Sequence, residues 1–543
     1  MLASSLYVPP VTGTAPEPVD TAAAPAEWEP LARLRAHVIG HVGDDGAVRD
    51  RCGSRVLESC LLLYLLRAEG IFEDTQRGIV EYLETHRADP PESGAYDPEV
   101  AAVEQTLVSA LLGESGASRV PLEAIDRYRH FTSPRKRFMF HTLFTELSVA
   151  DSDVPFDLAA VRYDSYATWV NLEMCALKIM RAHQQGEPGA VTDADRTYLL
   201  HHLATGSDRS VFEADIFAHA VGLLGLRRID PASPMIRSGL EALLRCQNPD
   251  GGFPFIAGWE PFGTAVCGLA LAHSGADPAV VTSMAEYLVR TRSDDGGWAF
   301  APRVRQSDAD CTPYCLELLR ATNDERFDTA IRATERYLLE LVNSDGGFGT
   351  YRYGDDSEVG VTGSAVSALE PLRHNDATSG NGRDHAAILD GAVRYLLHKQ
   401  QTDGTFERGW SASEANAMFR ALFAFRHYRS GPPDELRESV ESAAGAALRY
   451  FRRTQNPDGG WGQRPGDRSD VLSTSYSLLA LTCCDTDPAV VRKGTDWLVA
   501  QQHRDGGFSS RPDSAGPRPF PHDLPVLADG FALLALAYTG GRG

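Results

Sequence analysis

The 543-residue sequence has no Cys-x-x-Cys pair, no long apolar run and comparatively few basic residues. Its nine cysteines stand at positions 52, 60, 175, 246, 267, 311, 315, 483 and 484, a pattern that gives no zinc ribbon and indicates a reducing compartment. The densest apolar stretch, residues 60–66, is far shorter than the ~20 residues of a membrane-spanning helix. No basic segment followed by an apolar core opens the sequence. We therefore expect a cytoplasmic protein, for which peripheral contact with a membrane stays open.

Positive charge is scarce, because 52 Lys and Arg residues face 74 Asp and Glu residues and leave a net charge of −22. Such a charge opposes nonspecific binding to nucleic acid and to anionic lipid, so we expect small-molecule partners. Hydrophobic residues make up 43% and charged residues 23%, the composition of a globular protein with a large core. A chain of this length exceeds one ordinary core, and two domains are predicted.

A turn ending in Asp-Gly-Gly-aromatic, often with Gln at its start, recurs through the second half of the sequence. It occurs at residues 247–253 (QNPDGGF), 292–298 (RSDDGGW), 343–348 (NSDGGF), 400–406 (QQTDGTF), 455–461 (QNPDGGW) and 501–508 (QQHRDGGF). The aspartates of successive turns are 45, 50, 58, 55 and 47 residues apart, which leaves room for two helices in each step. The first glycine can adopt the positive φ that ends a helix. We interpret the aromatic residues as structural contacts between repeats.

Helical hairpins repeated around an axis close into an α/α barrel, or toroid, whose inner helices surround a cavity. The first half of the sequence also has apolar residues at helical spacing but only one weak turn, at residues 43–46 (GDDG). We expect an all-α protein in which residues 28–50 and 271–543 form one α/α barrel and residues 51–270 form a second, degenerate barrel inserted into it. Residues 1–27, rich in Pro, Ala and Thr, are expected to be a disordered lead-in.

From about residue 240 to 540 the turns resemble the QW repeats of squalene-hopene and oxidosqualene cyclases and of class II diterpene cyclases. The resemblance implies the βγ didomain architecture of bacterial class II terpene cyclases, with residues 51–270 as the γ domain. Other toroid families fit less well. Prenyltransferase β subunits need a cysteine ligand where residues 470–476 (DVLSTSY) offer serine and threonine. The Cys-His-Gly triplet of lanthionine cyclases, the thioester segment of complement-like domains and the D-D-x-x-D/E motif of class I cyclases are absent.

An acidic motif, Asp308-Ala-Asp310-Cys311-Thr312, follows the second of these turns. It resembles the D-x-D-D-T signature of class II cyclases, with Cys311 in place of the aspartate at the fourth position, and its D-C-T part resembles the motif of oxidosqualene cyclases. In both variants the middle aspartate is the proton donor, which implies that role for Asp310.

Protonation of an alkene needs a carboxylic acid that stays protonated, dry and close to an apolar cavity until the substrate arrives. We expect Asp308 to hydrogen-bond Asp310 and orient its proton, and Cys311 to donate weakly to the carboxylate left behind. The competing interpretation is an ordinary helix start, with Ser307 or Asp308 as the N-cap and Asp310 in the first turn.

A second acidic motif lies in the first half, at residues 206–213 (GSDRSVFE). It resembles the D-x-x-x-x-E magnesium motif of bacterial class II diterpene cyclases, which implies Asp208 and Glu213 as ligands of Mg²⁺. Alternatively, residues 210–213 form a capping box at the start of a helix over 214–224. Basic residues that meet the phosphates are expected in the cleft between the domains, where Arg209 and Lys399 are candidates.

Aromatic residues should surround the reacting chain, because π faces stabilise carbocations. Candidates for the lining are Trp259, Phe262, Tyr314, Tyr351 and Trp410, each with an ordinary core position as its alternative. Trp410 lies in a Gly-Trp-Ser segment where the diterpene cyclases carry a tryptophan-containing motif, which makes it the best of the set.

We therefore predict a class II terpene cyclase of terpenoid biosynthesis that protonates the terminal alkene of geranylgeranyl or farnesyl diphosphate and forms a bicyclic product with the diphosphate retained. The twenty-carbon substrate is the favoured one, since it is common among bacterial relatives. Two alternatives stay open. One is a cyclase for squalene or a meroterpenoid precursor without diphosphate, suggested by the Asp-Cys-Thr variant, and the other is a noncatalytic toroid that binds an isoprenoid or a protein.

Overall fold

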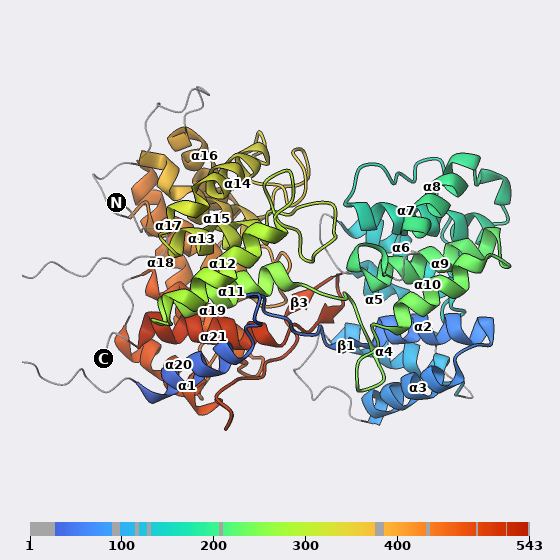
Figure 1. Ribbon diagram of the computed structural model, residues 1–543, viewed down its shortest axis with the longest axis horizontal. Helices are drawn as coiled ribbons and strands as arrows, with labels where there is room; N and C mark the ends of the chain where they lie inside the picture. Colours follow the sequence, from blue (N-terminus) through green and yellow to red (C-terminus); the bar gives the residue numbers. More distant parts are fainter. Residues whose placement is uncertain are drawn as a thin grey trace, which may run out of the picture.

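The computed structural model describes residues 28–88, 98–114, 119–127, 132–205, 210–374, 385–429, 435–484, 487–516 and 518–540. These residues form two helical lobes that lie side by side (Figure 1). We call the lobe that contains α1 and α11 to α21 the large barrel, and the lobe that contains α2 to α10 the inserted barrel. The expected lead-in, residues 1–27, lies outside the described residues.

Six helices of the large barrel form an inner ring, because α11, α13, α15, α17, α19 and α21 contact one another in that order and α21 contacts α11 again. Inner helices such as α19 are buried along their whole length, and the helices outside the ring, such as α18, bury one face. The helices are α1 (Glu29–Gly40), α11 (Glu260–His273), α12 (Pro278–Thr291), α13 (Thr312–Ala321), α14 (Asp328–Glu340), α15 (Val359–Leu369), α16 (His385–Lys399), α17 (Glu414–Arg426), α18 (Glu435–Thr454), α19 (Val471–Thr482), α20 (Pro488–Ala500) and α21 (Val526–Thr539).

The repeated turns join neighbouring helices in the way that their sequence predicts, six of them in the large barrel and one, at Gly251, against Gly78 of the inserted barrel. Each turn has its first glycine at a φ between 87° and 100°, at Gly46, Gly251, Gly296, Gly346, Gly404, Gly459 and Gly506. A Cβ atom at these positions would lie only 2.1 to 2.8 Å from a backbone carbonyl oxygen of a neighbouring outer helix. The indole nitrogens of Trp298 and Trp461 donate to the carbonyls of Leu288 (2.8 Å) and Phe451 (2.9 Å). The aromatic residues of these turns are therefore structural contacts, as expected.

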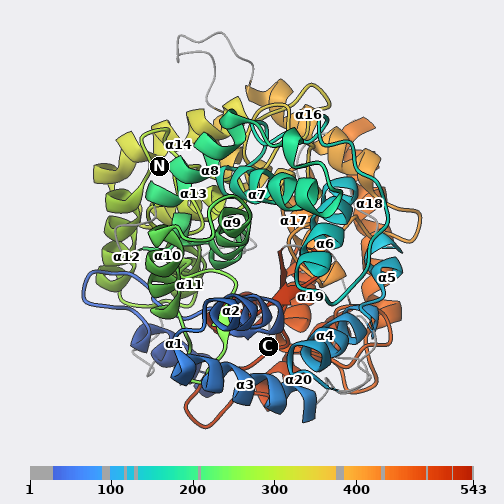
Figure 2. The same ribbon diagram turned by 90° about the vertical axis from the view of Figure 1, so that its right-hand side faces the viewer.

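The inserted barrel has a less regular ring, in which α2, α4, α5, α6, α7 and α9 follow one another and α9 returns to α2. It lies in front of the large barrel when the molecule is turned by 90° (Figure 2). Its helices are α2 (Val56–Glu69), α3 (Glu73–Ala88), α4 (Pro98–Leu111), α5 (Leu122–Arg127), α6 (Ser133–Glu146), α7 (Thr168–Gln184), α8 (Asp193–Thr205), α9 (Ile216–Ile229) and α10 (Pro234–Leu244).

The chain enters and leaves the inserted barrel at one place, where β1 (Ser54–Arg55) pairs antiparallel with β2 (Phe253–Pro254). The hydrophobic core changes from one barrel to the other between Phe253 and Ile256. Helix α11 therefore belongs to the large barrel, and the expected boundary at residue 270 lies too far along the chain. A second short pair, β3 (Ser514–Ala515) with β4 (Pro521–His522), lies in the loop before α21. None of the described helices is both long and apolar enough to cross a membrane.

Candidate active site

The acidic motif forms the turn that leads into α13. The Oδ1 atom of Asp308 accepts the backbone N–H groups of Asp310 (3.1 Å) and Cys311 (2.6 Å), and burial raises the pKa of Asp308 to about 7. Asp308 therefore fixes the backbone of the motif just before α13, whose N-cap is Cys311, so Asp310 does not lie in the first turn of the helix as the competing interpretation had it. The partner of the Asp308 side chain is the backbone N–H of Asp310 and not its carboxyl, which we had expected.

Asp310 projects from this turn toward α17, where its carboxylate forms an ion pair with Arg420. The Arg420 side chain is 6% exposed and that of Asp310 is 23% exposed. The guanidinium carbon of Arg420 lies 5.3 Å from the centre of the Tyr314 ring. The candidate donor is thus less dry than we expected, and nothing in the sequence had pointed to Arg420 as its buried cationic partner.

Two further residues of the motif have other contacts than those we expected. The Cys311 sulfur lies 3.7 Å from the sulfur of Cys315, one turn along α13, so the predicted bond to the Asp310 carboxylate was wrong. The Thr312 hydroxyl accepts the backbone N–H of Trp298 (2.9 Å) and donates to its carbonyl (3.2 Å). Thr362 and Thr474 accept the corresponding N–H groups in two other repeats, which identifies Thr312 as part of the repeat architecture.

A cavity adjoins the Asp310 carboxylate at the mouth of the inner ring. Its aromatic lining comes from four residues, Phe262, Trp410, Tyr476 and Phe531. Trp410 and Phe262 therefore lie where we expected them. Tyr314 instead lies beside the Arg420 guanidinium, and Trp259, 2% exposed, packs in the core of the large barrel.

A larger cavity, of about 350 Å³, opens in the cleft between the two barrels. It shares two wall residues, Glu358 and Trp410, with the cavity at Asp310. Tyr351, the remaining aromatic candidate, lines this cleft together with Tyr166 and Trp169. The two cavities are consequently neighbours that meet at Trp410 and Glu358.

Three basic side chains line the cleft: Arg135 and Lys136 from α6, and Arg518 from the loop before α21. Burial, together with the neighbouring charge of Arg135, lowers the pKa of Lys136 to about 7. Four acids line the same cavity: Glu173, whose pKa is raised by burial, Asp355, Asp356, and Glu358, which lies 3.5 Å from Arg518. The three basic side chains come from both barrels and offer charged hydrogen-bond donors to an anion in the cleft.

The basic candidates from the sequence lie elsewhere. Lys399 is exposed on α16, where its ammonium group lies 5.3 Å from the centre of the Tyr395 ring, so its expected place in the cleft was wrong. Arg209 lies outside the described residues, as does Asp208. The run Arg135-Lys136-Arg137 in an acidic chain was the pattern that could have pointed to the cleft.

Glu213 lies in a short turn before α9, with an unusual backbone φ of 45°. Its Oε2 accepts the hydroxyl of Thr168. Its buried Oε1 forms an ion pair with Arg305, 3.8 Å from the guanidinium Nε, but no hydrogen bond within the part of the chain that the structure describes. Burial raises the pKa of Glu213. Helix α9 begins at Ile216 and is capped by Asp215, so Glu213 does not belong to the capping box that we had considered. The side chain lines a third cavity, beside Arg303 and Arg305.

Comparison with known proteins agrees with this geometry. Residues 214–411 match the prenyltransferase alpha-alpha toroid domain, and residues 434–536 match the squalene-hopene cyclase C-terminal domain. A drimenyl diphosphate synthase from Streptantibioticus cattleyicolor is 40% identical over 527 residues, covering 94% of each chain. One from Streptomyces showdoensis is 39% identical over 93% of each chain.

Among solved structures, ent-copalyl diphosphate synthase from Streptomyces platensis superposes with a TM-score of 0.57 at 18% identity, covering 94% of this chain and 100% of that chain. This likeness shows a shared fold over both barrels. Taken with the relatives of 40% and 39% identity, it shows that the chain belongs to the bacterial class II terpene cyclases of the squalene-hopene cyclase-like superfamily, enzymes that begin ring closure by protonating an alkene.

Proposed function

We propose that the protein cyclises farnesyl diphosphate to a bicyclic diphosphate of the drimenyl type. Its two relatives of 40% and 39% identity, which match nearly the whole chain, are drimenyl diphosphate synthases. This likeness favours the fifteen-carbon substrate over the twenty-carbon one that the sequence alone had favoured. It also argues against a substrate without diphosphate.

One observation carries the proposal: the cationic cleft and the cavity at Asp310 share Trp410 and Glu358 as a common wall. A diphosphate held by Arg135, Lys136 and Arg518 would let the isoprenoid chain pass the Trp410 ring and bring its far alkene to Asp310. The diphosphate is then remote from the reacting end, which accounts for its retention in the product.

The chemistry at the far end follows from the neighbours of Asp310. The step requires Asp310 in its protonated form, whose carbonyl oxygen can still accept a hydrogen bond from Arg420. The carboxyl proton passes to the terminal alkene, the π electron pair forms the new C–H bond, and a tertiary carbocation results. The carboxylate that is left forms the charge-assisted ion pair with the buried Arg420, which stabilises it. The rings of Phe262, Trp410, Tyr476 and Phe531 stabilise the cation through their π faces while the internal alkenes close the rings.

We also propose that Glu213 contributes to a magnesium site, together with Asp208. The Oε1 atom of Glu213 is buried, has no hydrogen bond within the described part of the chain and lies 3.8 Å from the exposed Arg305, so a metal ion would replace that guanidinium as its cationic partner. Thr168, which hydrogen-bonds Glu213, directly precedes Trp169 in the wall of the cleft. When bound, Mg²⁺ would neutralise part of the diphosphate charge.

The location is a proposal as well. All nine cysteines lie among the described residues, and none of them forms a disulfide, which supports a reducing compartment such as the cytoplasm.

Incubation of the purified protein with ten-, fifteen- and twenty-carbon diphosphates and Mg²⁺, followed by phosphatase treatment and mass spectrometry, tests the substrate. We expect a bicyclic fifteen-carbon alcohol. Conversion of the twenty-carbon substrate alone would contradict the chain length, and no conversion of any diphosphate would contradict the proposed function.

The matched variant is Asp310→Asn, which keeps the size of the side chain and removes the acid. We expect it to lose nearly all turnover while its circular dichroism and Tm stay close to the wild-type values. Unchanged function in this variant would favour the noncatalytic toroid.

A further inference from the structure

The turn that closes the large barrel departs from the chemistry of the other turns. In the repeats at Gly297 and Gly347, the second glycine lies against a tyrosine ring of the next outer helix, and a threonine hydroxyl accepts the N–H of the aromatic residue that follows. At the closing turn the ring is His37 of α1, which lies against Gly507, and the acceptor is the Asp529 carboxylate of α21, 2.7 Å from the Phe508 nitrogen. The positions that hold a tyrosine and a threonine in the other two repeats thus hold His37 and Asp529 in the closing turn, and both of these residue types can bind a metal ion.

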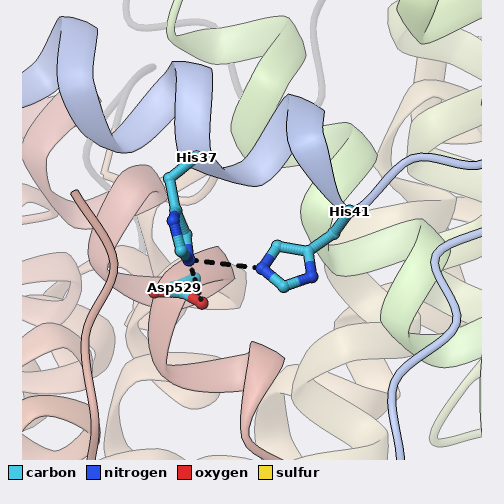
Figure 3. A group of neighbouring side chains, drawn as sticks. All are labelled: His37, His41 and Asp529. Atoms are coloured by element: carbon cyan, nitrogen blue, oxygen red, sulfur yellow. Dashed lines mark hydrogen bonds and ion pairs between the residues drawn. The ribbon is translucent and has the colours of Figure 1, made fainter. Parts of the chain in front are cut away.

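A third ligand type completes the group, because His41 lies one helical turn after His37 on the same face of α1. Figure 3 shows both imidazole rings and the Asp529 carboxylate directed toward one another across the contact between α1 and α21. His37 Nε2 lies 3.2 Å from His41 Nε2 and 3.5 Å from Asp529 Oδ2. One ligand atom from each of the three residues lies within 4.8 Å of the others.

Two of the three distances match those between ligands of one metal ion. With metal–nitrogen bonds of about 2.0–2.1 Å, two ligands of a tetrahedral zinc ion lie roughly 3.3–3.4 Å apart. The distances from His37 Nε2 to His41 Nε2 (3.2 Å) and to Asp529 Oδ2 (3.5 Å) fall on either side of that value. The distance from His41 to Asp529 is at most 4.8 Å, so these two ligands would have to approach each other to bind one ion.

The three side chains bring three possible metal-donor atoms together. His37 Nε2 faces both the imidazole nitrogen of His41 and a carboxylate oxygen of Asp529. The Asp529 residue is 5% exposed. A cation between the three atoms would compensate the buried carboxylate and accept both nitrogen lone pairs.

We propose that His37, His41 and Asp529 bind a divalent transition metal ion of the zinc type, with a water molecule as the fourth ligand. Imidazole ligands favour such ions over Mg²⁺, which separates this site from the magnesium site proposed at Glu213. His37 and His41 are half-buried, so the ion can reach the site from solvent. The ion joins α1 to α21, and α21 carries Leu527 and Phe531 in the wall of the Asp310 cavity.

The test uses the full chain without an affinity tag, stripped with a chelator and dialysed. Zn²⁺ alone is titrated by calorimetry, and Co²⁺ is titrated while its visible absorption is recorded. We expect one Zn²⁺ per chain, an intense tetrahedral Co²⁺ band, and a rise in Tm of a few degrees on metal addition, because the ion binds the folded chain. The site variant is His41→Gln, and the matched control is His398→Gln, an exposed histidine on α16.

Binding should weaken at least about tenfold in His41→Gln and stay unchanged in His398→Gln. Asp529→Asn keeps an acceptor for the Phe508 N–H and should show the same loss of Zn²⁺ affinity. Agreement between the two site variants would show that the loss does not come from a folding defect in one of them. Failure of the wild-type chain to bind Zn²⁺, equal binding by wild type and His41→Gln, or a weak octahedral Co²⁺ spectrum would each overturn the proposal. None of these measurements depends on cyclase activity.

Discussion

Replacement of Arg420 by methionine should slow the chemical step without weakening substrate binding. Arg420 forms an ion pair with Asp310, its side chain is 6% exposed, and it does not line the cationic cleft. The pair stabilises the carboxylate that appears when the proton leaves, so its benefit is greatest in the transition state. A hydrogen bond to a charged group is worth about 1.5–3 kcal/mol, and each 1.36 kcal/mol corresponds to tenfold in rate. We therefore expect kcat to fall by roughly 10- to 150-fold.

The assay is steady-state turnover of farnesyl diphosphate, with product measured by mass spectrometry after phosphatase treatment. The KM should change little, since the diphosphate is held in the other cavity. Arg426→Met is the matched control, because Arg426 lies on the same helix, half-buried, with its guanidinium over Phe423 at 4.5 Å. A kcat of Arg420→Met within twofold of the wild-type value, in a folded protein, would refute the role assigned to the ion pair. So would an effect confined to KM.

Three further outcomes are expected. The pKa of Lys136 is about 7, so its positive charge is lost as pH rises through that value. We therefore expect kcat/KM for the diphosphate substrate to fall above neutral pH. The Lys136→Arg variant stays charged and should lose less kcat/KM above neutral pH than the wild type. Glu213→Gln should raise the Mg²⁺ concentration needed for half-maximal rate at least about tenfold, and an unchanged Mg²⁺ titration would contradict the proposed site. Gly459→Ala should lower the free energy of unfolding by about 1–3 kcal/mol, as followed in a thermal melt. The reason is that φ at Gly459 is 100° and a Cβ atom there would lie 2.6 Å from the Lys493 carbonyl oxygen. Gly445→Ala, on α18, is the control and should leave the free energy of unfolding unchanged or raise it.

The parts of the molecule that local sequence determines were predictable. The Asp-Gly-Gly turns identify the large barrel, because the positive φ of a residue such as Gly296 and the hydrogen bond from Gly297 to Asp295 are set within a few residues. The position of Asp310 beside a cavity follows from the same regularity. The inserted barrel has helices without these turns, so its existence could be inferred but its boundary could not be placed correctly.

The remaining site residues depend on contacts between distant segments. Arg420 reaches Asp310 across 110 residues, and nothing in the sequence around it distinguishes it from the other arginines. The cleft combines Arg135 and Lys136 of one barrel with Arg518 of the other. Only the docking of the two barrels makes these three cations neighbours, and sequence periodicity carries no information about that docking.

The insertion between α1 and α11 has a consequence for the order in which the chain can fold. Helix α1 packs against α21 and α11, and the closing turn at Gly506 lies against the Arg33 carbonyl of α1. During synthesis the segment from β1 to β2 leaves the ribosome well before α21, so the inserted lobe can collapse around its own core first. Helix α1 can meet α11 once the inserted lobe has been made, but its contact with α21 forms only when this last inner helix of the ring is complete. We expect truncation before α21 to leave a protease-resistant fragment near residues 54–254 and a large barrel that is digested.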